Sequence, residues 1–489
     1  MKTMDRRTFL KTSALTTASL SLMPALGRSQ PANARVIGAN EDIRVAVVGF
    51  NGRGGSHISG FRELKGVRLV ALCDADKDVL EKGVQKLKEA GQTVEGYQDM
   101  RKLIENKDID AISFATPNHW HALGTIWAVQ AGKDVYVEKP LSHNVWEGRQ
   151  VVKAARKYGR MVQTGSQCRS SRGLQEAIAW LQAGNLGKIL RARGLCYKRR
   201  ASIGKADKPL EIPPAIDYDL WCGPAPKEPL MRKRLHYDWH WVWPTGNGDL
   251  GNQGVHQVDI ARWVLGENEI APVAFSIGGR LGYEDDGTTP NTQIIYQGYA
   301  RAPLLFEVRG LPAGSQNDKM DNYHGAGIGV VIDCEGGRVV IPSYIKALVF
   351  SKDNSTDKPD REFDGGGDHY ENFIKAVRSR KHTDLAADAL DGHVSAALCH
   401  TANVSYCLGK KMPPDEIRDA VKNNPDMAEA LGRMEEHFAA NNVDLKKTPA
   451  TLGEVLKLDV KTERCSGNKK INEMLTRNYR KPFVVPKKV

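Results

Sequence analysis

The chain has 489 residues, of which 26% are charged, and its formal net charge is +12. This length predicts at least two domains with buried cores, and the positive charge raises a nucleic-acid partner as an alternative. The densest basic cluster has neither a helix-turn-helix pattern nor a ladder of aromatic residues around it, so a solvated face or the rim of an anionic-substrate site is favoured over nucleic acid; the cluster comprises Arg191, Arg193, Lys198, Arg199 and Arg200.

Residues 1–34 are typical of an export signal rather than of a folded domain. Residues 5–11, Asp-Arg-Arg-Thr-Phe-Leu-Lys, match a twin-arginine signal and precede a mildly apolar run that ends at Ala25. That run is too short and too polar to span a membrane stably. The sequence therefore predicts export by the twin-arginine translocase to the periplasm, without a stable membrane anchor.

The first apolar run, residues 43–48, leads directly into a glycine-rich turn. Strand, tight turn and helix in this order are typical of a dinucleotide-binding site. The second glycine position of the G-x-G-x-x-G pattern holds Asn51, and asparagine tolerates left-handed backbone better than most residues, so the turn is expected to survive. The residues predicted to contact the cofactor here are Gly49, Asn51, Gly52, Arg53 and Gly54.

A second apolar run, residues 67–72, ends at Asp74, which lies 25 residues after Gly49. A carboxylate at this place accepts both hydroxyls of a ribose and repels a 2′-phosphate. No arginine follows at once, and Asp76 adds another acid. NAD is therefore favoured over NADP as the cofactor, with an aspartate that merely begins a turn as the alternative.

Strand and helix patterns continue to alternate as far as residue 165. Further strands are predicted at 110–115, 134–138 and 161–164, and a helix at 147–158. This alternation predicts an α/β fold whose parallel sheet is covered on both faces, and we assign residues 35–165 to an NAD-binding Rossmann domain. Ligands of such sheets collect at the carboxyl ends of the strands. Two motifs stand there: Thr116-Pro117-Asn118-His119-Trp120-His121 and Glu138-Lys139-Pro140.

The composition changes after residue 165. Residues 166–412 are predicted to form a substrate-binding α+β domain with a large, open and mainly antiparallel sheet, including helices at 369–378 and 392–408. Residues 413–489 are predicted to form a helical extension. The stretch 190–245 is rich in aromatic residues, which suit either stacking on sugar rings or a core; those considered are Tyr197, Trp239, Trp241 and Trp243.

Together with Gly254-Val255-His256-Gln257-Val258-Asp259, these motifs make the chain similar to the Gfo/Idh/MocA oxidoreductases from about residue 43 to residue 409. The resemblance implies the two-domain fold above, and a homo-oligomer is expected. It also implies that the loop after residue 115 lies beside the nicotinamide and its ribose. The residues implied as cofactor contacts are Thr116, Asn118, His121, Glu138 and Lys139.

Oxidation of a sugar alcohol needs a base near neutral pKa and a positive donor for the developing alkoxide. We predict Lys139 and His256 as the catalytic residues; Glu138 is expected to orient Lys139 or the nicotinamide ribose. On a helix, Asn252, His256 and Asp259 share one face. Asn252 and Asp259 are predicted to bind substrate, and so is Arg169 at the start of the second domain.

Metal and disulfide chemistry are not expected. His119 and His121 stand two apart, but no third ligand follows at a recognisable spacing. The 8 cysteines show no C-x-x-C spacing, and a twin-arginine substrate folds in a reducing cytosol, so buried free thiols are favoured over disulfides.

The functional hypothesis is an exported NAD-dependent oxidoreductase that acts on the CH–OH group of a sugar or glycoside, with C3 considered as the carbon that is oxidised. Free NAD is a cytosolic pool, so the cofactor is expected to be bound tightly before export. The alternative is an NAD-dependent, redox-neutral glycoside hydrolase, a chemistry that some members of the family carry out. A non-catalytic protein that binds a sugar or a partner is the third possibility.

Overall fold

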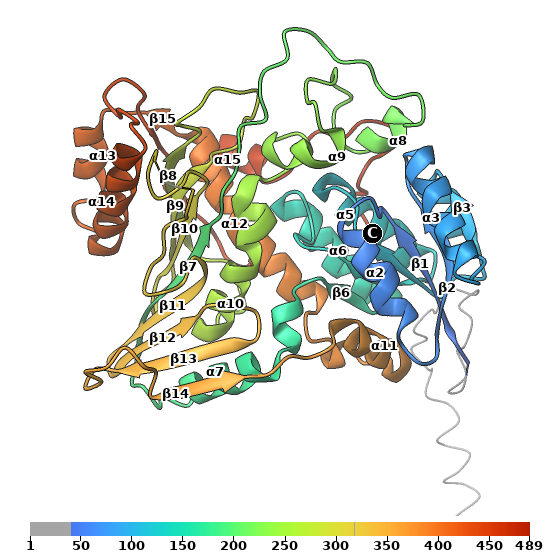
Figure 1. Ribbon diagram of the computed structural model, residues 1–489, viewed down its shortest axis with the longest axis horizontal. Helices are drawn as coiled ribbons and strands as arrows, with labels where there is room; N and C mark the ends of the chain where they lie inside the picture. The colour runs from blue at the N-terminus through green and yellow to red at the C-terminus, as the bar shows by residue number, and fades with distance from the viewer. Residues whose placement is uncertain (1–40, 317) are drawn as a thin grey trace, which may run out of the picture. The chain divides into compact units, whose positions relative to one another are not determined.

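The structure, a computed structural model, describes residues 41–316 and 318–489; the predicted leader at 1–34 lies outside these ranges. Strands and helices alternate from residue 43 to residue 164, and the strands form a wholly parallel sheet (Figure 1). The elements are β1 (Ile43–Val48), α2 (Arg53–Arg62), β2 (Val67–Cys73), α3 (Lys77–Glu89), β3 (Glu95–Tyr97), α4 (Met100–Glu105), β4 (Ala111–Phe114), α5 (Asn118–Gln130), β5 (Asp134–Val137), α6 (Val145–Tyr158) and β6 (Val162–Thr164).

The strand order of this sheet is β3-β2-β1-β4-β5-β6, which confirms the predicted Rossmann arrangement. Strand β1 is buried along its whole length, because helices cover both faces of the sheet and every side chain meets one of them. The order reverses between β1 and β4. Ligands of doubly wound sheets bind in the crevice outside the carboxyl ends of the strands at such a reversal. The edge strand β3 is short and exposed, and the sequence did not reveal it.

The second part is built on a larger sheet in the order β14-β13-β12-β11-β7-β10-β9-β8-β16-β15, with β17 paired to β8. Its pairs are antiparallel except β7 with β10, which confirms the predicted open, mainly antiparallel sheet. The strands are β7 (Ile189–Tyr197), β8 (Val273–Gly279), β9 (Thr292–Gly298), β10 (Leu304–Arg309), β11 (Ile328–Cys334), β12 (Gly337–Ile341), β13 (Lys346–Ser351), β14 (Arg361–Asp364), β15 (Lys410–Lys411), β16 (Thr451–Leu452) and β17 (Leu456–Lys457).

Helices cover both faces of this larger sheet as well. Along β10, Phe306 packs with α10 and α12 on one face, whereas Leu305 packs with α13 and α14 on the other. The helices and single turns of this part are η2 (Gln167–Ser170), α7 (Arg172–Gln182), α8 (Tyr218–Cys222), α9 (Leu235–Asp238), η3 (Trp239–Trp241), η4 (Leu250–Gly254), α10 (Val255–Leu265), α11 (His369–Ser379), η5 (His382–Asp384), α12 (Ala389–Leu408), α13 (Pro414–Val421), α14 (Pro425–Ala440) and α15 (Lys469–Met474).

The segment 413–489 is not purely helical, which differs from the prediction. After α14 the chain adds β16 and β17 to the larger sheet. Its last residues then return to the Rossmann part. The ring of Phe483 lies 5.5 Å from that of Trp120 on α5, and the Tyr479 hydroxyl donates to Glu147 Oε1 on α6 at 2.9 Å. The tail therefore joins both parts of the fold.

Candidate active site

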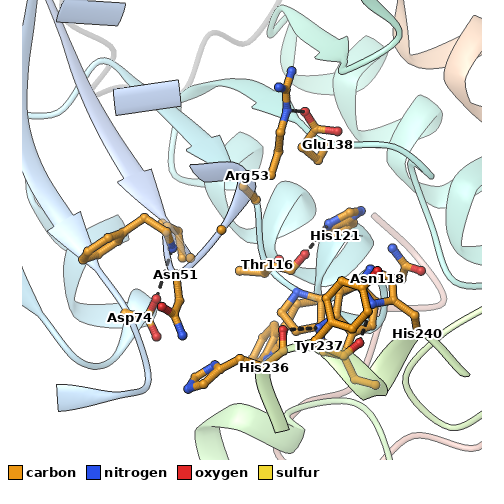
Figure 2. A pocket seen from close by; sticks show the side chains of 18 of the residues that line it. Asn51, Arg53, Asp74, Thr116, Asn118, His121, Glu138, His236, Tyr237 and His240 are labelled. Atoms are coloured by element: carbon orange, nitrogen blue, oxygen red, sulfur yellow. Dashed lines mark hydrogen bonds and ion pairs between the residues drawn. The ribbon is translucent and has the colours of Figure 1, made fainter. Parts of the chain in front are cut away.

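A cavity of about 610 Å³ lies at the carboxyl ends of β1, β2, β4 and β5, and the π-helical turn η4 and the start of α10 also contribute to its lining. Figure 2 shows part of this lining, including Asn51, Asp74 and Thr116. The predicted site residues that line it are Gly49, Asn51, Gly52, Arg53, Asp74, Thr116, Asn118, His121, Glu138, Lys139, Asn252 and His256. Gly54 does not line the cavity and packs against the carbonyl of Gly49 within the turn. Arg169 and Asp259 are not among the lining residues. Most of the predicted residues are thus brought together.

The glycine turn is built for close backbone approach. Gly49 has a φ of 77°, and a Cβ on Gly54 would lie 2.1 Å from the carbonyl oxygen of Gly49, so only glycine fits there. Gly52 caps α2 without a side-chain hydrogen bond, which leaves the first N–H groups of the helix to face an anion such as a pyrophosphate. Asn51 is not among the residues with positive φ, so the turn does not use the left-handed tolerance expected of it.

Asp74 lies where the carboxylate for a ribose was predicted. Its two oxygens accept hydrogen bonds from the backbone N–H groups of Phe50 and Asp76, each at 3.1 Å. Burial raises the pKa of Asp74, although these two donors stabilise its charge. A carboxylate has about four acceptor sites, so two remain for ribose hydroxyls.

Two buried polar atoms on the wall of the cavity test whether a dinucleotide fits. Thr116 Oγ1 and Asn118 Oδ1 have no hydrogen-bond partner among the residues that the structure describes. Buried polar atoms are costly unless they are hydrogen-bonded. A ligand that carries hydroxyl and amide groups, as a nicotinamide riboside does, would satisfy both. The donor set and the glycine turn therefore fit the cofactor that the sequence predicts.

His121 lines the same wall, but its ring nitrogens face the protein. Nδ1 lies 2.6 Å from the carbonyl oxygen of Pro140, and Nε2 lies 2.8 Å from that of Thr116 (Figure 2). Burial lowers the pKa of His121. The ring thus fastens the loop after β4 to the loop after β5, whereas the prediction made it a direct contact of the cofactor.

Lys139 is held at the floor of the cavity. Its Nζ donates to the backbone carbonyl of Asn252 at 2.9 Å. That carbonyl belongs to the π-helical turn η4, where the regular α-helical ladder is interrupted just before α10. Burial lowers the pKa of Lys139, although the neighbouring Glu138 opposes the shift. An ammonium with a lowered pKa exchanges protons more readily near neutrality.

Glu138 is fixed by a network that sequence reasoning missed. Its Oε1 meets Arg53 Nε at 2.9 Å, His57 Nε2 at 3.1 Å and Gln167 Nε2 at 3.1 Å. Burial favours the neutral acid, but the His57 contact and the cations around it hold the pKa of Glu138 well below its usual range. The carboxylate therefore stays charged and cannot serve as a general acid. His57 sits inside an ordinary helix pattern, and no spacing marked it.

His256 lies in the cavity at the start of α10, and its ring is 4.9 Å from that of Tyr344. Burial, together with the positive charge of Lys139, lowers the pKa of His256 to about 3. Within the described ranges no carboxylate contacts this ring; its Nδ1 faces Cys168 Sγ at 4.0 Å. The imidazole is therefore neutral at physiological pH and less basic than the near-neutral base that was expected.

Arg169 and Asp259 are paired with each other instead of facing a substrate. Arg169 Nε and Nη2 donate to the two carboxylate oxygens of Asp259 at 2.8 and 2.9 Å, and Ser395 Oγ donates to the same carboxylate at 2.6 Å. Burial opposes the charge of Asp259, but Arg169 holds its pKa below the usual value. Of the three residues predicted to share a helical face, Asn252 and His256 line the cavity and Asp259 does not; the π-helical turn η4 interrupts the α-helical spacing between them. Neither residue is placed where it could bind substrate.

Replacing Arg169 with methionine is expected to lower the free energy of unfolding by about 3 kcal/mol, because the carboxylate of Asp259 loses its main partner while it stays buried. Denaturant unfolding of the purified protein measures this. Arg172→Met is the matched control: Arg172 is exposed, so its loss is expected to change stability by less than about 0.5 kcal/mol. If Arg169→Met left the stability unchanged and raised KM, the result would instead support the predicted role of Arg169 in substrate binding.

The open side of the cavity is covered by a segment that we define as residues 218–245. His236, Tyr237, Trp239 and His240 from this covering segment line the cavity (Figure 2). The rings of Trp239 and His240 stack with centroids 3.6 Å apart. Of the aromatic residues considered as sugar platforms, only Trp239 lines the cavity.

The other three aromatic residues are engaged elsewhere. The Tyr197 hydroxyl donates to the buried Glu307 at 2.6 Å. Trp241 lies under the guanidinium of Arg200 at 4.9 Å, and the ring of Trp243 lies 6.4 Å from that of Tyr406. The run of aromatic residues thus serves mainly to pack the covering segment.

The described residues contain no group of three or more His, Cys, Asp or Glu side chains arranged to hold a metal ion. The ring nitrogens of His119 lie near the carbonyl oxygens of Trp221 and Thr245, at 3.0 and 3.3 Å. All cysteines are free thiols, and Cys407 is the exposed one. Among the described helices, none is long and apolar enough to cross a membrane.

Comparison with curated proteins finds relatives that match part of the chain. The Glycosyl hydrolase family 109 protein of Shewanella pealeana is 33% identical over 168 residues, which cover 31% of this chain and 37% of that protein. The Alpha-N-acetylgalactosaminidase of Shewanella oneidensis is 34% identical over 178 residues, which cover 32% of this chain and 38% of that protein. The matched segments thus span well under half the length of these relatives.

Solved structures show the same fold at low identity. The WlbA dehydrogenase from Bordetella pertussis, in complex with NADH and UDP-GlcNAcA, superposes with a TM-score of 0.55 and 19% identity over 74% of this chain and 97% of that chain. The model of the oxidoreductase family with an NAD-binding Rossmann fold matches residues 43–166, and the model of its C-terminal alpha/beta domain matches residues 185–431. The chain therefore belongs to the Gfo/Idh/MocA family of NAD-binding oxidoreductases.

Proposed function

We propose that the protein is an exported NAD-dependent oxidoreductase that acts on the CH–OH group of a sugar or glycoside and holds its cofactor tightly. The observation that carries this proposal is the position of Lys139. Its ammonium is fixed at 2.9 Å from the Asn252 carbonyl, in the same cavity as His256 and the glycine turn. A proton-exchanging group and a dinucleotide site thus share one cavity.

When bound, NAD supplies the acceptor for the hydride that leaves the carbinol carbon. The residues of the chain handle the proton. One N–H of the Lys139 side chain donates to the Asn252 carbonyl, so the other sites on its Nζ are available to hydrogen-bond a substrate hydroxyl. Neutral Lys139 can take the hydroxyl proton, and the N–H of the neutral His256 ring can donate a hydrogen bond to the oxygen of the same hydroxyl. Their burial keeps competing water out and strengthens both interactions.

Asp74 supports NAD rather than NADP as the cofactor. Its carboxylate lies on the cavity wall, with both oxygens already oriented by backbone donors. A 2′-phosphate at this place would meet a negative charge, whereas ribose hydroxyls would find acceptors. The twin-arginine pattern adds a reason for tight binding, since the cofactor must be acquired before export to the periplasm.

Redox-neutral glycoside hydrolysis is the second candidate, and the names of the curated relatives favour it. Such a reaction needs an acid for the leaving group. The carboxylates that line the cavity are Asp74, Asp99 and Glu138. Asp74 faces the glycine turn, Asp99 pairs with Arg101 at 2.6 Å, and Glu138 is held charged. Among the described carboxylates that line the cavity, none is free for this role, so we place oxidation first, and non-catalytic binding third.

The two reactions differ in their need for an electron acceptor. With a glycoside and an acceptor, we expect a keto sugar whose glycosidic bond is intact, and no product without the acceptor. Mass spectrometry and NMR of the reaction in D₂O measure both. Release of the aglycone without an acceptor, with deuterium at C2 from elimination and readdition, would replace oxidation by hydrolysis. Absence of both products from a panel of glycosides would favour a binding protein.

A further inference from the structure

The cationic side chains that line the cavity are only partly paired with carboxylates of the protein. Four cationic side chains line it: Arg53, Lys139, Lys198 and Arg200. Arg53 pairs with Glu138 at 2.9 Å, and Arg200 pairs with Asp249 at 2.6 Å. Among the described residues, no carboxylate oxygen lies within 4.0 Å of the ammonium nitrogen of Lys139 or Lys198. Two ammonium groups in one cavity are therefore left without an anionic partner.

The backbone directs Lys198 into the cavity. Lys198 follows β7 directly, and its N–H donates to the carbonyl of Arg309 at the end of β10 at 3.0 Å. Arg200 is anchored two residues later, through its N–H to the carbonyl of Gly310 at 2.9 Å. Lys198 and Arg200 line the cavity, while Arg199 between them is exposed. Side chains alternate in this way along an extended backbone, and the alternation places the side chain of Lys198 on the cavity side.

Lys198 stands at the catalytic end rather than at the glycine turn. Its Nζ is 3.5 Å from Gln253 Oε1, and Gln253 Nε2 donates to the Tyr344 hydroxyl at 2.8 Å. Gln253 follows Asn252, whose carbonyl holds Lys139. The contact at 3.5 Å is long for a hydrogen bond, so the ammonium of Lys198 has little bonding within the protein. A ligand beside Lys139 would lie within its reach.

We propose that the substrate is an anionic sugar, whose carboxylate or other oxyanion substituent pairs with Lys198 while a ring hydroxyl meets Lys139. This inference rests on the proposed carbohydrate substrate. The ammonium of Lys198 attracts such an anion, and its half-buried position makes this attraction stronger than it would be in open water. A neutral sugar leaves the charge of Lys198 partly desolvated and unpaired. The basic cluster that the sequence shows at 191–200 thus contributes one residue to specificity.

Equilibrium binding tests this inference without any turnover. Matched methyl glycosides of a hexose, its hexuronate and its sulfate ester are titrated against the holoenzyme, and quenching of tryptophan fluorescence, to which Trp239 in the cavity contributes, reports occupancy. We expect at least one anionic sugar to bind about tenfold or more tightly than the neutral one. The preferred anion distinguishes a carboxylate from a sulfate ligand. Equal affinity for neutral and anionic sugars in the unmodified protein would overturn the proposal.

Variants then locate the anion. Lys198→Gln is expected to remove the preference, whereas Lys198→Arg retains the charge and is expected to keep most of it. Arg199→Gln is the matched control, because it removes the same charge from the neighbouring exposed position and is expected to leave the preference unchanged. A preference that survives Lys198→Gln, or is lost in Arg199→Gln, would contradict the assignment. Because binding alone is measured, a wrong reaction type leaves this test intact.

Discussion

Replacing Lys139 with alanine is expected to reduce turnover by about 10²–10⁴-fold, the usual cost of losing a general acid–base group. Its Nζ is the titratable atom fixed at the cavity floor by the Asn252 carbonyl. The other predicted dinucleotide contacts, among them the glycine turn and Asp74, are unchanged in this variant, so the fold and the bound cofactor should be retained. Single-turnover formation of bound NADH, followed by absorbance after substrate addition, measures the chemical step separately from cofactor release.

Lys139→Arg separates two roles of this side chain. An arginine keeps the positive charge but does not give up its proton, so it supports an alkoxide without taking the hydroxyl proton. We expect Lys139→Arg to be nearly as slow as Lys139→Ala. A variant at this position with more than a tenth of the unmodified activity would show that Lys139 does not carry the proton.

The pH profile of the unmodified protein gives an independent check. Lys139 must be neutral to accept a proton, so oxidation should accelerate as pH rises through its pKa, which burial places below the ordinary value for lysine. His256 has a pKa of about 3, so it stays neutral over this range and adds no limb near neutrality. Lys139→Ala should abolish the rising limb, whereas His256→Ala should lower the rate and leave the limb in place.

Replacing Gly54 with valine is expected to abolish cofactor binding. Its Cβ would lie 2.1 Å from the Gly49 carbonyl, and that contact cannot form unless the turn that approaches the pyrophosphate is displaced. Gly55→Ala is the matched control, because a Cβ on Gly55 meets nothing within 4 Å. The measurement is the dinucleotide released when each purified protein is denatured.

The unmodified protein in the same experiment tests which cofactor is bound and whether the protein is exported. Purified from the periplasmic fraction, it is expected to release NAD after dialysis, identified by mass. Release of NADP would contradict the role of Asp74, and release of no dinucleotide would contradict tight binding. Recovery from the cytosol alone would contradict export. If Gly54→Val retained NAD at the level of Gly55→Ala, the glycine turn would not be the pyrophosphate site.

The dinucleotide end of the site could be predicted because its geometry is local. The turn from Gly49 to Gly54 is one contiguous piece of backbone, and Asp74 stands at the end of the adjacent strand. The same holds for Lys139, which directly follows β5 and Glu138. Where a residue is placed by the strand that precedes it, the order of the sequence is enough to put it at the carboxyl edge of the sheet.

The substrate end could not be predicted in the same way, because distant residues decide it. Arg169 and Asp259 are separated by 90 positions, and only the folded chain shows that they are bonded to each other. The π-helical turn η4 interrupts the α-helical spacing, and Asn252 and His256 line the cavity while Asp259 does not. The covering segment is irregular, so no periodicity marked His236 or His240 as residues of the cavity wall.

Residues 477–480 hold the covering segment in place, and they follow it by more than 200 positions in the sequence, so the cover is completed in a fixed order. Arg480 Nη1 donates to Asp219 Oδ1 at 2.8 Å, and Arg477 Nη2 donates to the carbonyl of Pro244 at 3.0 Å, near the two ends of that segment. These arginines are synthesised long after the covering segment and the Rossmann part. The Rossmann part can fold earlier, during synthesis, and its cofactor cleft is then still uncovered. Synthesis of residues 477–480, rather than folding of the nucleotide domain, is therefore the event that secures the cover over the site.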